Sequence, residues 1–82
     1  LLSHKLTALD VSWVAGDAPQ AGNYTAKTRY RQADNACRFV TTESLIQKGF
    51  SLDFEDPQWA VTPGQFSVLY DGEVCLGGGV IS

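Results

Sequence analysis

Hydrophobic and polar residues alternate along most of this chain of 82 residues. A period of two places successive side chains on opposite faces of a β-strand, whereas helical side chains repeat every 3.6 residues. The clearest example is the segment 50–55, in which Phe50, Leu52 and Phe54 alternate with polar side chains. The pattern therefore predicts a β-protein, and this segment is its best-defined half-buried strand.

Five further segments predict strands: 6–14, 23–32, 37–41, 66–70 and 74–81. Their alternation predicts these face-sharing sets: Leu9, Val11 and Trp13; Tyr24, Ala26, Thr28 and Tyr30; Cys37, Phe39 and Thr41; Phe66, Val68 and Tyr70. Segment 42–48 allows either a loop or a short helical turn. We expect segment 56–58 to end the strand before it, because Pro57 lacks the amide donor that a central strand needs.

Turn signals separate these strands. Segment 15–22 predicts a loop and segment 33–36 a short turn. Pro63 and Gly64 fit the two central positions of a type II turn. Asp71 and Gly72 predict a two-residue type I′ hairpin loop. The triple glycine 77–79 has no helix or lysine after it, as a phosphate-binding loop would, so we expect a bulge or bend where a barrel closes.

Six short strands without a convincing helix predict an all-β fold, a small and roughly six-stranded antiparallel β-barrel. Closure would remove the exposed strand edges that promote aggregation. The length allows a single domain, residues 1–82. Because the chain begins at Leu1 and contains no methionine, we expect it to be a fragment, the tail of a longer protein.

The charge is distributed unevenly. Six Lys and Arg stand against nine Asp and Glu, a net charge of −3, which argues against broad nucleic-acid binding. Yet Lys27, Arg29 and Arg31 fall on one face of the strand predicted at 23–32. Alternate residues of a strand lie roughly 6.5–7 Å apart, close to the phosphate spacing of a nucleic acid. A phosphate-binding ridge and a merely solvated strand face both remain open.

The chain offers little chemistry of its own. His4, the one histidine, lies in a terminus that we expect to fray, and no nucleophile elbow surrounds a serine. The acidic segment 53–56 lacks calcium-loop spacing. Cys37 and Cys75 are too few for a zinc site, and we expect both to be buried, reduced, structural thiols. No apolar run is long enough to span a membrane. We therefore expect no catalytic residue, cofactor or metal in this chain.

Four ordered motifs and the Asp-Val-Ser-Trp segment that ends at Trp13 resemble one family. The motifs are 26–32 (AKTRYRQ), 54–58 (FEDPQ), 60–65 (AVTPGQ) and 70–79 (YDGEVCLGGG). They are similar to the C-terminal barrel of bacterial tRNA-specific 2-thiouridylases, over nearly the whole chain. Ala33 and Ala36 depart from the family, which often has prolines there, and this leaves the turn geometry open.

The resemblance implies that residues 1–82 are the C-terminal fragment of a larger multidomain enzyme, a cytoplasmic sulfurtransferase of three parts. Its N-terminal domain binds ATP, adenylates the wobble uridine of certain tRNAs and carries the catalytic cysteines. A persulfide brought by sulfur-relay proteins supplies the sulfur. The barrel would contact tRNA and adjoin the ATP-binding domain in cis. By this resemblance neither Cys37 nor Cys75 is catalytic, and the isolated fragment is inactive.

The family's tRNA contacts would map onto Arg29, Tyr30 and Gln65, and we expect Lys27 and Arg31 to add attraction. An arginine fork suits phosphate, and tyrosine can stack on a base. Tyr30 has the inward parity of its strand, so a core position is equally open. Two other functions compete: a protein-interaction barrel like those of translation factors, and a structural module that docks on its parent.

Overall fold

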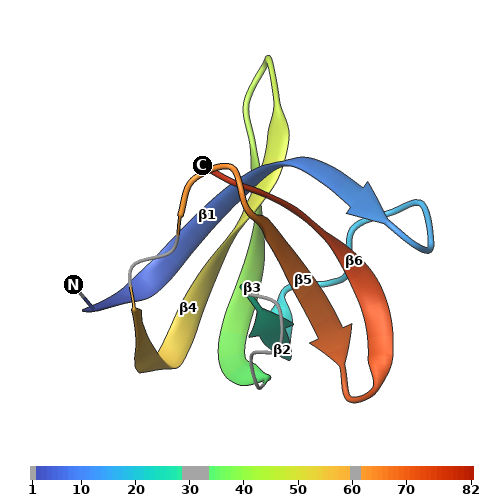
Figure 1. The fold of residues 1–82 in the computed structure, drawn as a ribbon. Helices are drawn as coiled ribbons and strands as arrows, with labels where there is room; N and C mark the ends of the chain where they lie inside the picture. Colours follow the sequence, from blue (N-terminus) through green and yellow to red (C-terminus); the bar gives the residue numbers. More distant parts are fainter. Residues whose placement is uncertain (1, 29–33, 60–61) are drawn as a thin grey trace.

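Six strands form a closed antiparallel barrel in the computed structural model, which describes residues 2–28, 34–59 and 62–82. The strands are β1 (Leu2–Trp13), β2 (Gly22–Lys27), β3 (Asn35–Glu43), β4 (Lys48–Trp59), β5 (Phe66–Asp71) and β6 (Val74–Ile81). Their order around the barrel is β1-β4-β3-β2-β5-β6 (Figure 1). The predicted all-β barrel is confirmed. No described residue belongs to a helix that could cross a membrane.

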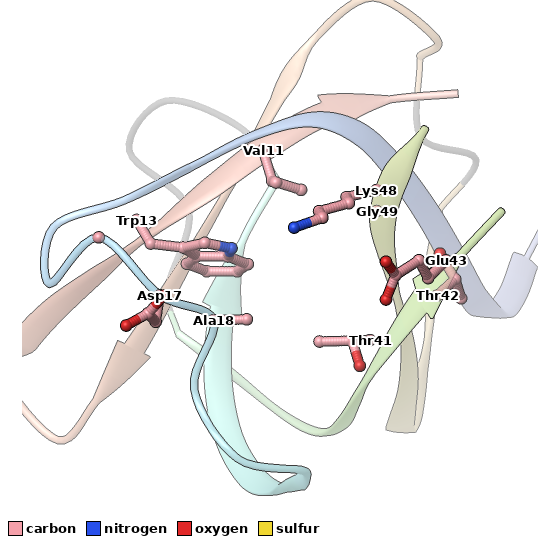
Figure 2. Close-up of a pocket in the computed structure, with 10 residues that line it drawn as sticks. Val11, Trp13, Asp17, Ala18, Thr41, Thr42, Glu43, Lys48 and Gly49 are labelled. Atoms are coloured by element: carbon pink, nitrogen blue, oxygen red, sulfur yellow. The ribbon is translucent and has the colours of Figure 1, made fainter. Parts of the chain in front are cut away.

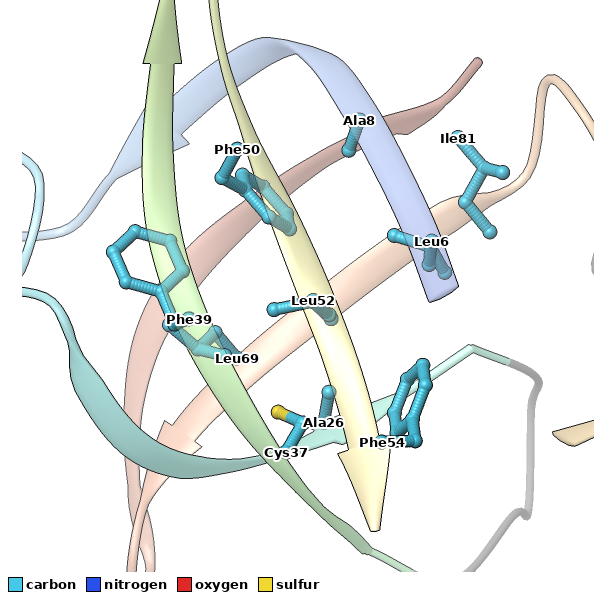
Figure 3. Packing of buried hydrophobic residues seen from close by; sticks show 10 residues of the cluster. All are labelled: Leu6, Ala8, Ala26, Cys37, Phe39, Phe50, Leu52, Phe54, Leu69 and Ile81. Carbon is cyan, nitrogen blue, oxygen red and sulfur yellow. The ribbon is translucent and has the colours of Figure 1, made fainter. Parts of the chain in front are cut away.

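One apolar cluster fills the barrel (Figure 3). Its buried members are Leu6, Ala8, Ala26, Cys37, Phe39, Phe50, Leu52, Phe54, Leu69 and Ile81. Phe39 and Phe50 are fully buried, with ring centroids 5.5 Å apart. Trp13 closes the cluster at one end and contacts both rings, at 5.6 and 5.5 Å. The faces predicted for segments 37–41 and 50–55 are confirmed, except that Thr41 is exposed.

Strand β1 changes its inward face at Asp10. Leu6 and Ala8 are buried before it, whereas Val11 and Trp13 pack against the core after it. The pairing with β6 shifts register between Leu9 and Ser12, and Asp10 has a φ of 51°. A bulge inserts one extra residue, so the alternation reverses, and aspartate tolerates this left-handed conformation better than most residues. The prediction was therefore right only for the part after the bulge.

Strand β4 continues through Pro57, so the predicted break at 56–58 is wrong. Its pairs with β1 jump from Lys5↔Asp53 to Ser3↔Gln58, and its ladder with β3 ends at Phe54. Pro57 therefore lies in an irregular stretch without a ladder partner, where a missing amide donor costs little. His4 is part of β1 rather than a frayed terminus, and its Nδ1 lies 3.0 Å from the Phe54 carbonyl oxygen.

Strand β2 ends at Lys27, and Ala26 and Thr28 are buried on the expected face. The rest of the strand predicted at 23–32, residues 29–32, lies outside the described residues. The face of strand β5 that points into the barrel is the opposite of the predicted one. Ser67 and Leu69 are buried, and Phe66 is 47% exposed. The Phe66 ring lies outside, against Gly78, where an added Cβ would come within 3.0 Å of it. An aromatic side chain that covers a cross-strand glycine is a known way to stabilise such a pair.

The predicted Pro63–Gly64 turn is confirmed, whereas the predicted Asp71–Gly72 loop is wrong in position and in type. Gly64 has a φ of +93° and the Gln65 N–H donates to the Thr62 carbonyl at 3.2 Å, which confirms the type II turn. The β5–β6 loop is Gly72–Glu73, one residue later than predicted, because Asp71 pairs with Val74. Only the first loop residue has a positive φ, the pattern of a type II′ turn.

The segment 42–48 is a hairpin rather than a helical turn. β3 continues to Glu43, β4 starts at Lys48, and residues 44–47 form the loop between them.

The glycines of β6 form the closing seam, as predicted. A Cβ on Gly77 would collide with the Ser12 carbonyl oxygen, and one on Gly78 with the Ser67 carbonyl oxygen. A Cβ on Gly79 would lie 2.7 Å from the Leu9 carbonyl oxygen. The three residues let β6 pass close between β1 and β5, which is the use of glycine at a sharp bend.

Candidate functional site

The antiparallel register gives the barrel two chemically different ends. β2 finishes at Lys27, which pairs with Val68, so Gln65 at the start of β5 belongs to the same end. We call it the Gln65 end; Asp34, which precedes β3, also belongs to it. The opposite end contains the end of β1 at Trp13 and the β3–β4 hairpin loop, residues 44–47. We call it the Trp13 end.

Backbone hydrogen bonds fix the position of Gln65, and its side chain is exposed. Its N–H donates to the Thr62 carbonyl at 3.2 Å, and its carbonyl accepts the Ile81 N–H at 2.7 Å. Gly64 also donates its N–H to the Ile81 carbonyl, at 2.8 Å. These bonds fix the Pro63–Gly64 turn to the end of β6. Within the described ranges the Gln65 side-chain amide makes no hydrogen bond, so it is available to a ligand.

Lys27 already has local partners. Its Nζ lies 3.5 Å from Asp34 Oδ1, with both side chains about 40% exposed (41% and 38%). It also lies 5.3 Å from the centroid of the Tyr70 ring. Exposed ion pairs are weak, so a phosphate could replace Asp34 at small cost. The other predicted contacts, Arg29, Tyr30 and Arg31, lie outside the described residues.

The two cysteines differ more than the sequence suggested. Cys37 is buried, and burial raises the pKa of its thiol to about 11. A thiol that stays protonated is a poor nucleophile. Cys75 is exposed, so the prediction that both thiols are buried is wrong for it. Both are free, and no group of three His, Cys, Asp or Glu in the described ranges could hold a metal ion.

A pocket of about 330 Å³ at the Trp13 end was not predicted from the sequence (Figure 2). Trp13, Val11 and Ala18 form one side, and Thr41, Glu43 and Lys48 come from the base of the β3–β4 hairpin. Its residues come from distant parts of the sequence, and no motif unites them. The one available signal was the apolar pair Leu45–Ile46 in the segment whose structure was ambiguous.

Comparison with known proteins gives a consistent result. The model of the family described as the aminomethyltransferase beta-barrel domain matches residues 3–81. Three similar proteins are each named tRNA-specific 2-thiouridylase MnmA. The one from Polynucleobacter asymbioticus is 58% identical over all of this chain and 22% of its own length. Those from Bordetella petrii and Acidovorax ebreus are 63% and 61% identical, also over all of this chain and 21% of their lengths. The chain thus spans about a fifth of these relatives.

Proposed function

Because the chain belongs to the aminomethyltransferase beta-barrel domain family, and its relatives are 2-thiouridylases, we propose that it is the tRNA-contacting domain of a tRNA-specific 2-thiouridylase. The parent enzyme thiolates the wobble uridine of tRNA with ATP and a persulfide sulfur donor. In this proposal the ATP site and the reactive cysteines belong to other domains, and the barrel supplies substrate binding. The parent works in the cytoplasm and receives sulfur from relay proteins.

One pair in the sheet register carries the tRNA-binding role. Lys27 pairs with Val68, three positions after Gln65, so the chain leaves β2 toward Arg29 at the end where Gln65 is exposed. Two segments that are 36 positions apart in the numbering thereby start from the same end of the barrel. We propose that Arg29, Tyr30 and Gln65 form one contact surface there, with Lys27 and Arg31 as additional cations.

The chemistry of this end suits an RNA backbone. Arginine binds phosphate oxygens with two parallel N–H groups. The Gln65 amide can donate a hydrogen bond to, and accept one from, a base edge or a ribose hydroxyl. A contact with the 2′-hydroxyl is what allows a protein to distinguish RNA from DNA. Cys37 supports a purely binding role, because burial keeps its thiol protonated and inside the barrel.

The test is a salt titration of tRNA binding by the full-length enzyme and its Arg29→Ala variant. Loss of one phosphate contact should lower the slope of log affinity against log salt by about one unit. Lys48→Ala is the matched control, since Lys48 is a cation at the Trp13 end, and it should leave the slope unchanged. Equal affinities for wild type and Arg29→Ala at every salt concentration would refute the phosphate contact.

A further inference from the structure

We infer that the Trp13 end is a docking groove for a polypeptide segment of the full-length enzyme, one that carries an aliphatic side chain beside a lysine or arginine. The groove is lined by Trp13, Val11, Asp17, Glu43 and Lys48. The exposed tip Leu45–Ile46 belongs to the hairpin whose base Glu43 and Lys48 form, and we include it in the docking surface. The inference rests on the proposed function only in that this barrel is part of a longer enzyme.

The hairpin tip has apolar residues at positions where polar residues and glycine are usual. Leu45 and Ile46 occupy the two central positions of the β3–β4 loop and are 107% and 91% exposed. Glycine, asparagine, aspartate and serine dominate such positions. The hairpin projects well beyond the rest of the barrel (Figure 1). Two adjacent aliphatic side chains at a projecting tip lower solubility, and residues that break local rules concentrate at functional sites.

The tip is nevertheless held in a defined shape. The Ser44 N–H donates to the Gln47 carbonyl at 3.0 Å. The Ser44 hydroxyl oxygen accepts the N–H groups of Gln47 and Ile46, at 3.1 and 3.3 Å. These bonds close the loop and order the backbone from which the two apolar side chains project. An ordered apolar tip loses little conformational entropy when it binds, so it is suited to recognition.

The opposite wall of the groove is rigid as well. The Trp13 ring packs edge-on against Phe39, with an interplanar angle of 88°, so the core fixes its orientation. The Trp13 carbonyl accepts the Gly16 N–H, and the Val14 N–H donates to the Leu76 carbonyl, both at 3.0 Å. Within the described ranges the indole N–H has no hydrogen-bond partner, and it is left as a donor for a ligand.

The charges in the groove are unpaired. Asp17 and Glu43 contribute two carboxylates, and the Lys48 side chain extends across the pocket toward Trp13 (Figure 2). None of the three forms an ion pair with another described side chain. Two carboxylates against one ammonium leave a net negative groove, which repels the phosphates of RNA and attracts a cationic side chain.

These observations favour a protein partner over RNA. Leu45 and Ile46 offer neither an aromatic face to a base nor a hydrogen-bond donor to a phosphate, but they can enter an apolar pocket on another protein surface. The relatives are roughly five times longer than this chain, so a large protein surface exists within the same molecule. A segment linked to the barrel has a high effective concentration and needs only modest affinity to remain docked.

The experiment uses the fact that this chain has two tryptophans. Both the isolated barrel and the full-length enzyme are labelled with 5-fluorotryptophan and compared by fluorine-19 NMR without tRNA. Trp59→Phe identifies the Trp13 resonance in the barrel, and Trp13→Phe identifies it in the enzyme. In the full-length enzyme we expect the Trp13 resonance to shift and to lose its H₂O/D₂O solvent isotope effect.

The double variant Leu45→Ser, Ile46→Ser in the full-length enzyme should return the Trp13 resonance to its position in the isolated barrel. Leu2→Ser is the control, because Leu2 is an exposed apolar residue at the Gln65 end, and it should change nothing. A Trp13 resonance that is the same in barrel and enzyme overturns the inference. So does one that shifts only when tRNA is added, which would indicate an RNA site. Neither result affects the Arg29 salt titration.

Discussion

The two ends of the barrel share one set of strands but differ in chemistry. The Gln65 end presents an exposed amide, Lys27 and the exit toward Arg29, all suited to phosphate and ribose. The Trp13 end presents an indole, two carboxylates and an aliphatic tip, which suit a polypeptide. Antiparallel pairing produces this separation, because each strand runs from one end to the other and its termini can be specialised independently.

The proposed RNA contact has to be compatible with an acidic domain. A net charge of −3 would repel tRNA if it were spread evenly. Four carboxylates lie at the Trp13 end of their strands or in its loops, those of Asp17, Glu43, Asp71 and Glu73. Four others lie toward the Gln65 end, those of Asp34, Asp53, Glu55 and Asp56. The carboxylates therefore do not separate the two ends, and the proposed contact depends on where the individual cations lie.

The largest expected contrast is between the two cysteines. Cys75, exposed on β6, should react with iodoacetamide at about pH 8, whereas a pKa of about 11 leaves only roughly one Cys37 thiol in a thousand ionised. We expect Cys37 to react at least about a hundredfold more slowly, with burial adding to the effect. Mass spectrometry of the native protein, with Cys37→Ser and Cys75→Ser to assign the sites, measures both rates. Equal rates would mean that Cys37 is not inside the barrel wall.

The raised pKa of Cys37 also predicts a dependence of stability on pH. The thiol ionises at a higher pH in the folded protein, about 11, than at its ordinary value of 9.0. Its contribution is therefore complete below pH 9.0 and is lost as pH rises toward about 11. Cys37→Ala should flatten the alkaline decline in the free energy of unfolding relative to wild type. Parallel declines would show that the thiol ionises equally easily in both states.

The next effect concerns the glycines of β6, where the barrel closes between the two ends. Gly78→Ala would drive its Cβ into the Ser67 carbonyl and should lower the free energy of unfolding by about 3 kcal/mol. Gly22→Ala is the matched control, because the new Cβ would have ordinary contact with Tyr24 at 3.8 Å. That change should be about 0.5 kcal/mol or less. Urea unfolding measures both, and similar losses would show that the seam tolerates side chains.

The sequence predicted the core strands well because their alternation is uninterrupted. Phe50, Leu52 and Phe54 face the core as expected, and the Pro63–Gly64 turn has the positive φ that its glycine allows. Two errors arise where the period of two is broken. The bulge at Asp10 reverses β1, and the irregular stretch around Pro57 lets β4 continue past a residue that normally ends strands.

The predicted inward face of strand β5 was wrong for a different reason. Both of its faces contain apolar residues, and the pattern alone favoured the larger set of Phe66, Val68 and Tyr70. The pairing of β5 with β6 places Phe66 outside instead, since the glycine at position 78 on β6 leaves room for its ring on the outer surface of the barrel. The pocket at Trp13 was unpredictable on the same grounds, because it unites the end of β1 with a hairpin about 30 positions away.

The smallest expected effect separates charge from hydrogen bonding at the Gln65 end. Gln65→Ala removes an exposed amide but keeps the backbone bonds to Thr62 and Ile81, so the turn should stay folded. Loss of one hydrogen bond costs roughly 0.5–1.5 kcal/mol, which weakens tRNA binding by about two- to tenfold. The salt slope should not change, because no charge is lost. Gln47→Ala, an exposed glutamine at the Trp13 end, is the control and should bind tRNA like wild type. If both variants lost the same affinity, the two ends would not differ in their contact with tRNA.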